Sequence, residues 1–264
     1  MDILKRNLSP ISDRAWQEID EQARKVLRAN LSARKFADVD GPNGWEHTVN
    51  TIGRLNISGK NKPGEVNYGV FNVQPLTESR VEFELDIWEL DNVDRGAKDI
   101  NFDALDEAAK KIAQFEEEAV YKGFKGGGIT GLSETAENSV NLDTSSSGAI
   151  LNTVSQTVTT LNSKAVGGPY TLIAGPKLWT ALNTNSEGYP LRDRIQKILG
   201  GNIIYNPGNL GNFVVSTQGG DFELTIGQDL SIGYMSHTST SVKLFLTETF
   251  TFRVIAPEAA VVLK

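Results

Sequence analysis

The chain has 264 residues, a net charge of −7 and no cysteine, which excludes disulfides, thiol nucleophiles and cysteine-ligated metals. The acidic balance argues against nucleic-acid binding. His47 and His237 are the only histidines, so a Ser-His-Asp triad has two candidate bases, catalysis is disfavoured and no metal site is expected. No apolar run could span a bilayer and residues 1–16 lack a signal peptide's apolar core, so we expect a cytoplasmic protein without membrane contact.

Residues 12–31 are predicted to form an amphipathic helix. Ser12 is a good N-cap, and Ile11 and Trp16 stand at the two positions of a hydrophobic staple. Apolar residues then recur at helical spacing at Trp16, Ile19, Ala23, Val26 and Leu27, with Leu31 one turn on. The helix either packs on its own domain alone or also lines a binding groove.

Extended segments follow this helix. Residues 49–57 and 66–73 are typical of two strands that form a long hairpin around a polar loop. Another strand is predicted from Val81 to Leu90, with apolar residues on one face and acidic residues on the other. Trp88 falls on the acidic face, where another part of an assembly covers it or it offers a stacking platform to a flat ligand.

A second helix is predicted from Asp103 to Tyr121, with Asp103 as its cap and a glycine run after its end. Gly126, Gly128 and Gly131 spell the pattern G-x-G-x-x-G. A dinucleotide-binding fingerprint follows a strand, whereas this pattern follows a helix, so we reject a cofactor site here.

Helices and strands alternate between residues 130 and 220. Helices are expected at about 147–163, 176–182 and 191–199, strands at 170–175, 202–205 and 212–217, and a polar loop at 183–189. In the last strand, apolar residues alternate with polar ones from Val242 to Val254, which indicates one buried and one mostly polar face. These elements predict an α+β fold with an α/β part inserted between elements that pack together.

Six motifs resemble one known family. They are LKRNLSPISDRAWQEIDEQAR, RKFADVDGP, LDIWELDNVDRG, GPYTL, EGYPLRDR and the segment GGDFELTIGQDLSIGY followed by LFLTETFTFRV. In content and order they are similar to the encapsulins, the linocin-like shell proteins of bacterial nanocompartments (family 1), and the resemblance extends from Leu4 almost to the last residues.

The resemblance implies a Hong Kong 97 phage-like major capsid fold and an icosahedral shell of about 60 copies in its smallest form. The expected parts are an N-terminal helix and the start of a peripheral domain at 1–48, an extended hairpin arm at 49–80, the peripheral domain with its spine helix at 81–129, an axial domain at 130–220 and the peripheral-domain sheet at 221–264. A long hairpin cannot bury both of its faces alone, so pairing with a neighbouring copy is expected.

The resemblance further implies that the shell encloses a cargo enzyme, a ferritin-like iron oxidase or a dye-decolourising peroxidase, by binding its C-terminal targeting peptide. The matching groove positions are Leu27, Leu31, Arg34 and Asp38, facing Asp229, Leu230 and Ile232. Aliphatic side chains would form the trough, with Arg34 and Asp38 at its rim. Alternatively, Arg34 and Asp38 pair with each other on the surface.

Two more sites are implied by the resemblance. The segment expected at the five-fold pore comprises Asn183, Asn185, Ser186, Glu187, Gly188 and Tyr189. It would form a narrow polar opening for small ions, although it could equally be an ordinary solvated loop. Trp88 is the candidate for stacking on a flavin, a cofactor that the shell does not require.

Two alternatives remain. A phage-type capsid subunit would share the fold, but a packaged genome would favour a more basic interior. A protease-like or bacteriocin-like activity would need a nucleophile with a base, for which two isolated histidines are poor material. The sequence therefore favours a non-enzymatic shell protein over both.

Overall fold

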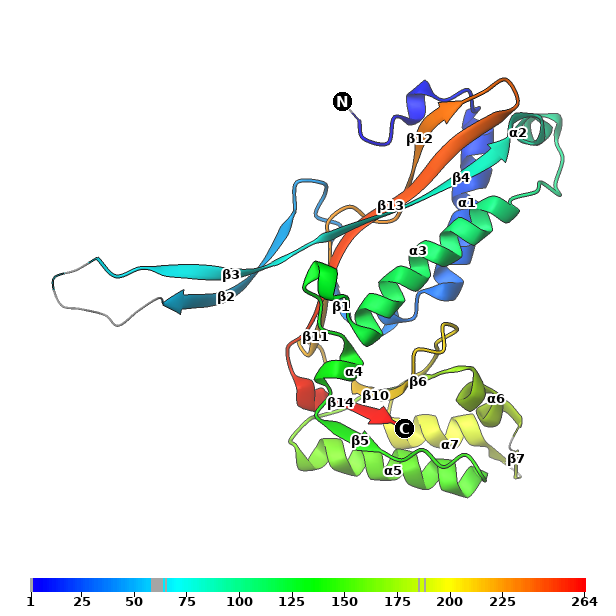
Figure 1. Cartoon of the computed structure of the whole chain (residues 1–264). Coiled ribbons are helices and arrows are strands. Elements are labelled where there is room, and N and C mark those ends of the chain that lie inside the picture. Colours follow the sequence, from blue (N-terminus) through cyan, green and yellow to red (C-terminus); the bar gives the residue numbers. More distant parts are fainter. Residues whose placement is uncertain (1, 58–63, 65, 185, 188) are drawn as a thin grey trace.

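The computed structural model describes residues 2–57, 64, 66–184, 186–187 and 189–264. Two bodies, each built on a five-stranded sheet, lie one above the other, and a hairpin projects sideways from the first (Figure 1). The fold is therefore mixed α and β, as the sequence predicts.

The first body is organised on strand β13. Its sheet comprises β1 (Asp38–Asp40), β4 (Thr77–Asp86), β11 (Phe222–Ile226), β12 (Ser231–His237) and β13 (Ser241–Val254). The antiparallel partners β11 and β12 cover successive stretches of β13, while β4 pairs with residues 241–250, and β1 adds to β11 in parallel.

The prediction of a solvent-facing polar side on β13 is wrong for its central part. Thr247, Thr249 and Thr251 are buried like the apolar residues that alternate with them. The Thr247 hydroxyl donates to the carbonyl of Ser79 at 2.9 Å, and the Thr249 hydroxyl accepts from the Gln228 N–H at 2.7 Å. Hydrogen bonding to backbone allows the hydroxyls of Thr247 and Thr249 to be buried, whereas the buried Thr251 hydroxyl has no hydrogen-bond partner among the described residues.

Helices cover this sheet. They are α1 (Asp13–Asn30), α2 (Ile87–Arg95) and α3 (Asp103–Lys122). A core of α1 and α3 residues packs against apolar side chains of β4, β12 and β13, and includes Ile19, Leu105, Ile112, Val242 and Leu244, all below 1% exposed. Both long helices confirm the sequence prediction, except that Phe102, not Asp103, occupies the N-cap of α3.

The second body follows α4 (Leu132–Thr135) and a short 3-10 helix. Its sheet runs in the order β5 (Asn138–Val140), β14 (Ala260–Leu263), β10 (Asn212–Ser216), β6 (Tyr170–Ala174) and β9 (Ile203–Tyr205). The helices α5 (Ser147–Ser163), α6 (Pro176–Thr184) and α7 (Leu191–Leu199) belong to this body, with β7 (Ser186–Glu187) and β8 (Tyr189–Pro190) between α6 and α7.

The assignment of residues 221–264 to the first sheet is wrong for the last strand. β14 pairs with β10 and β5 in the second sheet. A strand of four residues is too short for an alternation pattern to indicate which sheet it joins. The chain returns to the second body after β13, which brings β14 beside β10 and β5.

Aromatic stacking joins the two bodies. Tyr121, near the end of α3, stacks on Phe213 of β10 with ring centroids 5.5 Å apart. Phe36 packs against both Tyr121 and Phe222 of β11. One continuous core therefore runs from the lower part of the first sheet into the second.

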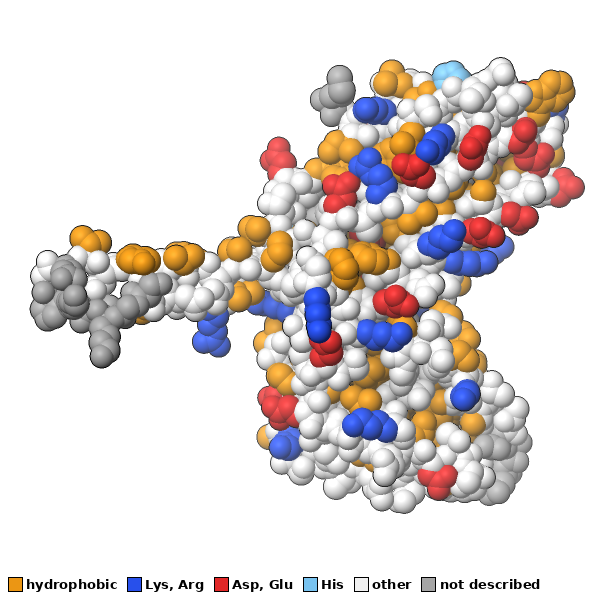
Figure 2. Space-filling view, viewed as in Figure 1, with side chains coloured by type: hydrophobic (Ala, Val, Ile, Leu, Met, Phe, Trp, Pro, Cys, Tyr) orange, Lys and Arg blue, Asp and Glu red, His pale blue; other side chains and the backbone are white. Residues whose placement is uncertain are grey.

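The hairpin of β2 (Val49–Ile57) and β3 (Gly69–Pro75) confirms the predicted pair of strands. Only Leu76 separates β3 from β4, so the arm is an extension of the first sheet. Apolar side chains line the arm in Figure 2, and the exposed ones among its described residues are Val49, Leu55, Ile57, Val66, Tyr68, Val70, Phe71 and Val73. Such a row of exposed apolar residues marks a surface that contacts another protein.

Candidate functional site

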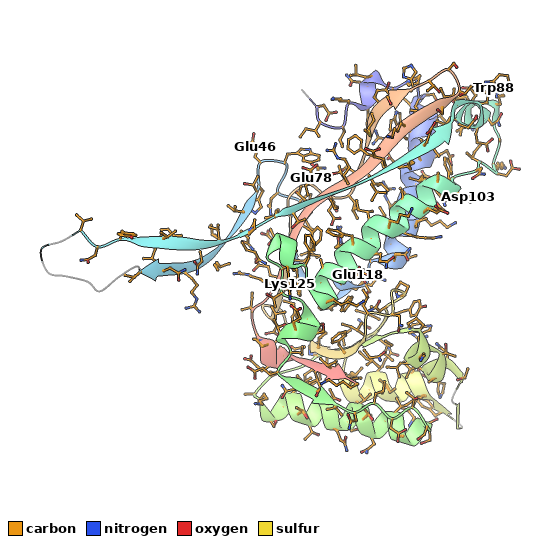
Figure 3. All side chains as sticks on the ribbon, in the orientation of Figure 1. Glu46, Glu78, Trp88, Asp103, Glu118 and Lys125 are labelled. Carbon is orange, nitrogen blue, oxygen red and sulfur yellow. The ribbon has the colours of Figure 1, made fainter. Side chains whose placement is uncertain are left out.

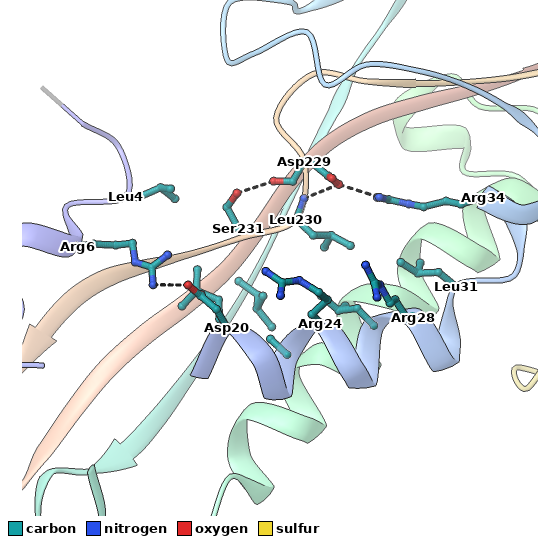
Figure 4. Close-up of a pocket in the computed structure, with 14 residues that line it drawn as sticks. Leu4, Arg6, Asp20, Arg24, Arg28, Leu31, Arg34, Asp229, Leu230 and Ser231 are labelled. Atoms are coloured by element: carbon teal, nitrogen blue, oxygen red, sulfur yellow. Dashed lines mark hydrogen bonds and ion pairs between the residues drawn. The ribbon is translucent and has the colours of Figure 1, made fainter. Parts of the chain in front are cut away.

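A groove of about 410 Å³ lies between helix α1 and the loop that leads into β12 (Figure 4). Helix α1 forms because Ser12 caps it, its hydroxyl accepting from the Ala15 N–H at 3.1 Å, and because its apolar residues follow helical spacing. Leu27 and Leu31 are mostly buried and form part of the floor, together with Ile232 and Leu246.

The opposite wall is the turn at residues 227–231. The Asp229 carboxylate accepts from the N–H of Leu230 at 2.8 Å, and the Ser231 hydroxyl donates to the Asp229 carbonyl at 2.7 Å. These bonds orient Asp229 toward Arg34, which lies across the groove in Figure 4. The end of the groove near Arg34 is thus held by short polar contacts.

Arg34 is bound by three carboxylates. Its Nη1 lies 2.7 Å from Asp229, Nε and Nη2 lie 2.9 and 2.5 Å from Glu116 Oε2, and Nη2 lies 3.1 Å from Glu248. The side chains of Glu116 and Glu248 are fully buried, whereas that of Asp229 is 48% exposed. Burial opposes the charge on Arg34, but the Glu116 carboxylate and the other two acids outweigh it and raise the pKa of Arg34.

Two buried glutamates in this region, Glu248 and Glu117, have raised pKa values. Burial, followed by the neighbouring Glu116 charge, raises the pKa of Glu248 well above its usual range. Burial also raises the pKa of Glu117 to about 7, although Glu117 accepts from the N–H groups of Ser32 and Ala33 at 2.8 and 2.7 Å.

Six of the seven predicted groove residues lie together. They are Leu27, Leu31, Arg34, Asp229, Leu230 and Ile232. Asp38 lies outside the groove, on β1, where its carboxylate accepts from the Gly220 N–H at 2.6 Å. The alternative of an Arg34–Asp38 pair is also wrong, because Arg34 bonds instead to the three acids described above.

Sequence reasoning missed part of the lining. The additional residues are Leu4, Arg6, Asp20, Ala23, Arg24, Arg28, Ser231 and Leu246. Asp20, Ala23 and Arg24 are one or two turns before Leu27, and Arg28 is one turn before Leu31, so helical spacing could have indicated them. Leu4 and Arg6 carry no such signal: they are placed by the bond from Tyr234 N–H to the Leu4 carbonyl and by the ion pair of Arg6 with Asp20, each 2.8 Å long.

The segment expected at a pore is only partly a loop. Asn183 belongs to helix α6, and its amide donates to the Trp179 carbonyl at 2.7 Å. Ser186 and Glu187 form β7, Tyr189 begins β8, and Asn185 and Gly188 lie outside the described residues. A helix-favouring run that starts at Pro176 extends α6 into the predicted loop.

Trp88 lies on helix α2, so the predicted strand from Val81 to Leu90 ends early. The Asp86 carboxylate accepts from the Glu89 N–H at 3.0 Å and caps the helix. Trp88 is 69% exposed and borders a hollow of about 410 Å³ with Glu84, Asp86 and Asp103 (Figure 3). The described residues of this hollow include carboxylates and no basic side chain, which suits the phosphate of a flavin nucleotide poorly.

Two kinds of feature are absent from the described part of the chain. Within it, no group of three or more His, Asp or Glu side chains is arranged to hold a metal ion. Across the same residues, no helix has the length and apolarity needed to cross a membrane.

The fold is the Hong Kong 97 phage-like capsid fold. A virus-like particle from Pyrococcus furiosus has a similar structure, with a TM-score of 0.66, 19% identity, and coverage of 94% of this chain and 98% of that one. The capsid of the Myoviridae phage XM1 matches with a TM-score of 0.58 at 12% identity, covering 89% and 92% of the two chains.

The sequence comparisons define the family within this fold. The model of the family described as "Encapsulating protein for peroxidase" matches residues 1–251. The type 1 encapsulin shell protein of Rhodospirillum rubrum is 39% identical, covering all of this chain and 97% of the relative, and that of Rhodococcus erythropolis is 37% identical, covering 98% of both. The chain belongs to the type 1 encapsulin shell proteins.

Proposed function

We propose that copies of this chain assemble into a closed shell that encloses a cargo enzyme. The observation that carries the proposal is the projecting arm, whose apolar residues remain exposed on a single chain. In a shell the arm packs against a second copy, which removes these side chains from water. About 60 copies form the smallest icosahedral shell.

The groove between α1 and the turn before β12 supports the second half of the proposal. It offers an apolar floor with charged residues at its rim, a combination that binds a short peptide through a few aliphatic anchors. The occupant is a C-terminal targeting peptide of the cargo, either a peroxidase or a ferritin-like iron oxidase. The family description, which refers to peroxidase, supports the first cargo.

Small ions reach the cargo through a pore that includes the segment 183–189. Tyr189 at this segment is half-exposed, with Lys197 Nζ 4.9 Å from its ring centroid. The flavin at Trp88 stays a prediction, as does a cytoplasmic location. In this proposal the shell is a structural protein, and the enclosed cargo enzyme carries out the catalysis.

Two other functions are less well supported. A protease would need a base beside a nucleophile, but the Nδ1 of His237 is 2.6 Å from the hydroxyl of Tyr234, a group that does not serve as an acyl-transfer nucleophile here. A phage capsid subunit shares the fold, but the closely matching relatives are encapsulin shell proteins.

The experiment is to measure the mass and shape of the purified chain by light scattering and negative-stain microscopy, with absorbance at 260 nm. A hollow particle above a megadalton with little nucleic acid is expected. Phe71→Asp places a charge on the arm and is expected to yield a folded chain that does not assemble, whereas Leu8→Asp, an equally exposed apolar position away from the arm, still assembles. A wild-type chain that remains monomeric or dimeric across salt and pH would refute the shell.

A further inference from the structure

Three buried polar side chains are hydrogen-bonded to one another where α3 meets the turn after α1. Glu117 and Tyr121 stand one turn apart on α3, and Ser32 belongs to the turn between α1 and β1. The Ser32 hydroxyl contacts a carboxylate oxygen of Glu117 and lies 2.7 Å from the Tyr121 hydroxyl. None of the three side chains is more than 3% exposed. They therefore tie the end of α3 to the segment that leads into β1.

Tyr121 extends this connection to the second body. Its ring stacks on Phe213 of β10, and Phe36, four residues after Ser32, packs against the same ring. Figure 1 shows the lower end of α3 directly above the second body. A change at Glu117 is thus transmitted, through two side-chain contacts, to the joint between the two bodies.

The hydrogen bonds of this group favour an ionised Glu117. In that state Ser32 donates to Glu117 and Tyr121 donates to Ser32, so both hydroxyl protons have an acceptor. With Glu117 protonated, three protons share the same two contacts, and one lacks an acceptor among the described residues. The N–H groups of Ser32 and Ala33 donate to Glu117 at 2.8 and 2.7 Å and also favour the carboxylate.

Burial and charge favour the proton. Burial, followed in effect by the neighbouring Glu116, outweighs the hydrogen bonds and raises the pKa of Glu117 to about 7. Tyr121 keeps its own proton, because burial and then the Glu117 charge raise its pKa well above the usual range. The opposing effects on Glu117 therefore nearly balance at neutral pH.

The surrounding charged groups do not neutralise Glu117. They come from α3, the segment after Ser32, β13 and the turn at residues 227–231, and are Glu116, Tyr121, Arg34, Lys35, Glu248 and Asp229. Arg34 is already bound by three of these acids, and Lys35 is exposed. From the second body the contact is the apolar ring of Phe213. Among the residues that the structure describes, no cation pairs with Glu117.

We propose that Glu117, Ser32 and Tyr121 form a pH-sensitive clasp, which holds the joint between the two bodies closed while Glu117 keeps its proton. Loss of the proton leaves a carboxylate buried without a cation, so the joint opens to water more often. The clasp lies within one chain, and its action does not depend on assembly into a shell.

The sign and size of the effect follow from the two states of Glu117. Its folded-state pKa of about 7 lies above the ordinary value of 4.5, so protonation favours the closed joint and this preference is lost as the pH rises through 7. With these two values, the equilibrium constant for opening rises about tenfold between pH 6 and pH 8.

Hydrogen–deuterium exchange of the full chain at pH 6 and pH 8 tests the clasp. Each rate is divided by the intrinsic exchange rate at the same pH, so that it reports opening. Peptides covering 30–37 and 117–127 report the joint, and a peptide from α5 reports the rest of the second body. The joint peptides of the wild-type chain should show a rise of about tenfold, with a much smaller rise in α5.

Two variants and a control assign the rise to this group. Glu117→Gln cannot ionise and should abolish the rise, whereas Glu107→Gln removes the same charge from an exposed position of α3 and should retain it. Ser32→Ala removes a donor to the ionised carboxylate, which raises the pKa of Glu117 further, so the rise between pH 6 and pH 8 should exceed that of wild type.

Equal corrected exchange at the two pH values, or a rise that survives in Glu117→Gln, overturns the clasp. A rise of the same size in α5 as in the joint also overturns it, because the whole fold is then losing stability. Should Glu117→Gln not fold, Ser32→Ala decides: a rise no larger than that of wild type rejects the clasp, and a larger one supports it.

Discussion

Replacing Arg34 with methionine tests whether its network stabilises the fold. Arg34→Met keeps much of the side-chain volume but leaves Glu116, which is fully buried, without its cation. Glu248, whose side chain is also fully buried, loses its contact of 3.1 Å with the same guanidinium. One uncompensated buried charge costs about 3–5 kcal/mol, so at roughly 2–4 °C per kcal/mol the melting temperature should fall by about 6–20 °C.

The loss should depend on pH. Burial already raises the folded-state pKa of Glu248, and Arg34 lowers it; without Arg34 this pKa rises further, so the folded variant holds a proton that the unfolded chain releases. The stability of Arg34→Met is then retained in acid and lost as the pH rises through that raised pKa. The gap between wild type and variant should therefore be larger at pH 8 than at pH 5.

Scanning calorimetry at matched protein concentration and at both pH values measures this effect. Arg34→Met/Glu116→Gln removes the unpaired charge and should recover part of the loss at pH 8. The control Asp229→Asn removes a half-exposed partner and should cost no more than about 1 kcal/mol. A shift below about 2 °C for Arg34→Met, or an equal shift at the two pH values, would refute the reasoning.

Two smaller predictions concern Glu117 and Ser12. The folded-state pKa of Glu117, about 7, lies above its ordinary value of 4.5, so its contribution to stability is present below pH 4.5 and lost as the pH rises through 7. Glu117→Gln cannot ionise, and its melting temperature should fall less than that of wild type between pH 5 and pH 8; parallel curves would contradict this. Ser12→Ala removes the cap of α1 and should cost about 0.5–2 kcal/mol, checked by the same calorimetry against the exposed change Ser236→Ala.

Local pattern was enough to predict the elements whose signals are long. The helix at 147–163 was predicted with the bounds that the structure has, because its apolar residues repeat over four turns. The hairpin was predicted because two extended segments flank a polar loop. The predicted strand from Val81 to Leu90 is wrong after Asp86 for a local reason: Asp86 caps α2, but the residues after it continue the apparent alternation of a strand.

Pairings across long sequence separations could not be predicted from pattern. Glu116 and Glu248 are 132 residues apart, and each looks like an ordinary charged residue of its helix or strand until the fold brings both to Arg34. The groove residues on α1 follow from helical spacing, but Leu4 and Arg6 do not, since their positions depend on β12 and Asp20. Of the seven groove positions named from the resemblance, six line one pocket, whereas Asp38 lies outside it because the chain has left α1 and entered β1 by that position.

The continuity of the arm with β4 has a mechanical consequence. The ladder between β4 and β13 contains ten residue pairs, and its hydrogen bonds lie across the strand direction. A neighbouring copy that pulls on the arm along β3 therefore loads these bonds in shear, all together, instead of opening them one after another. Because β12 pairs with the other edge of β13, the same tension reaches the wall of the groove, so stress in the shell and the proposed site of cargo attachment share one load-bearing strand.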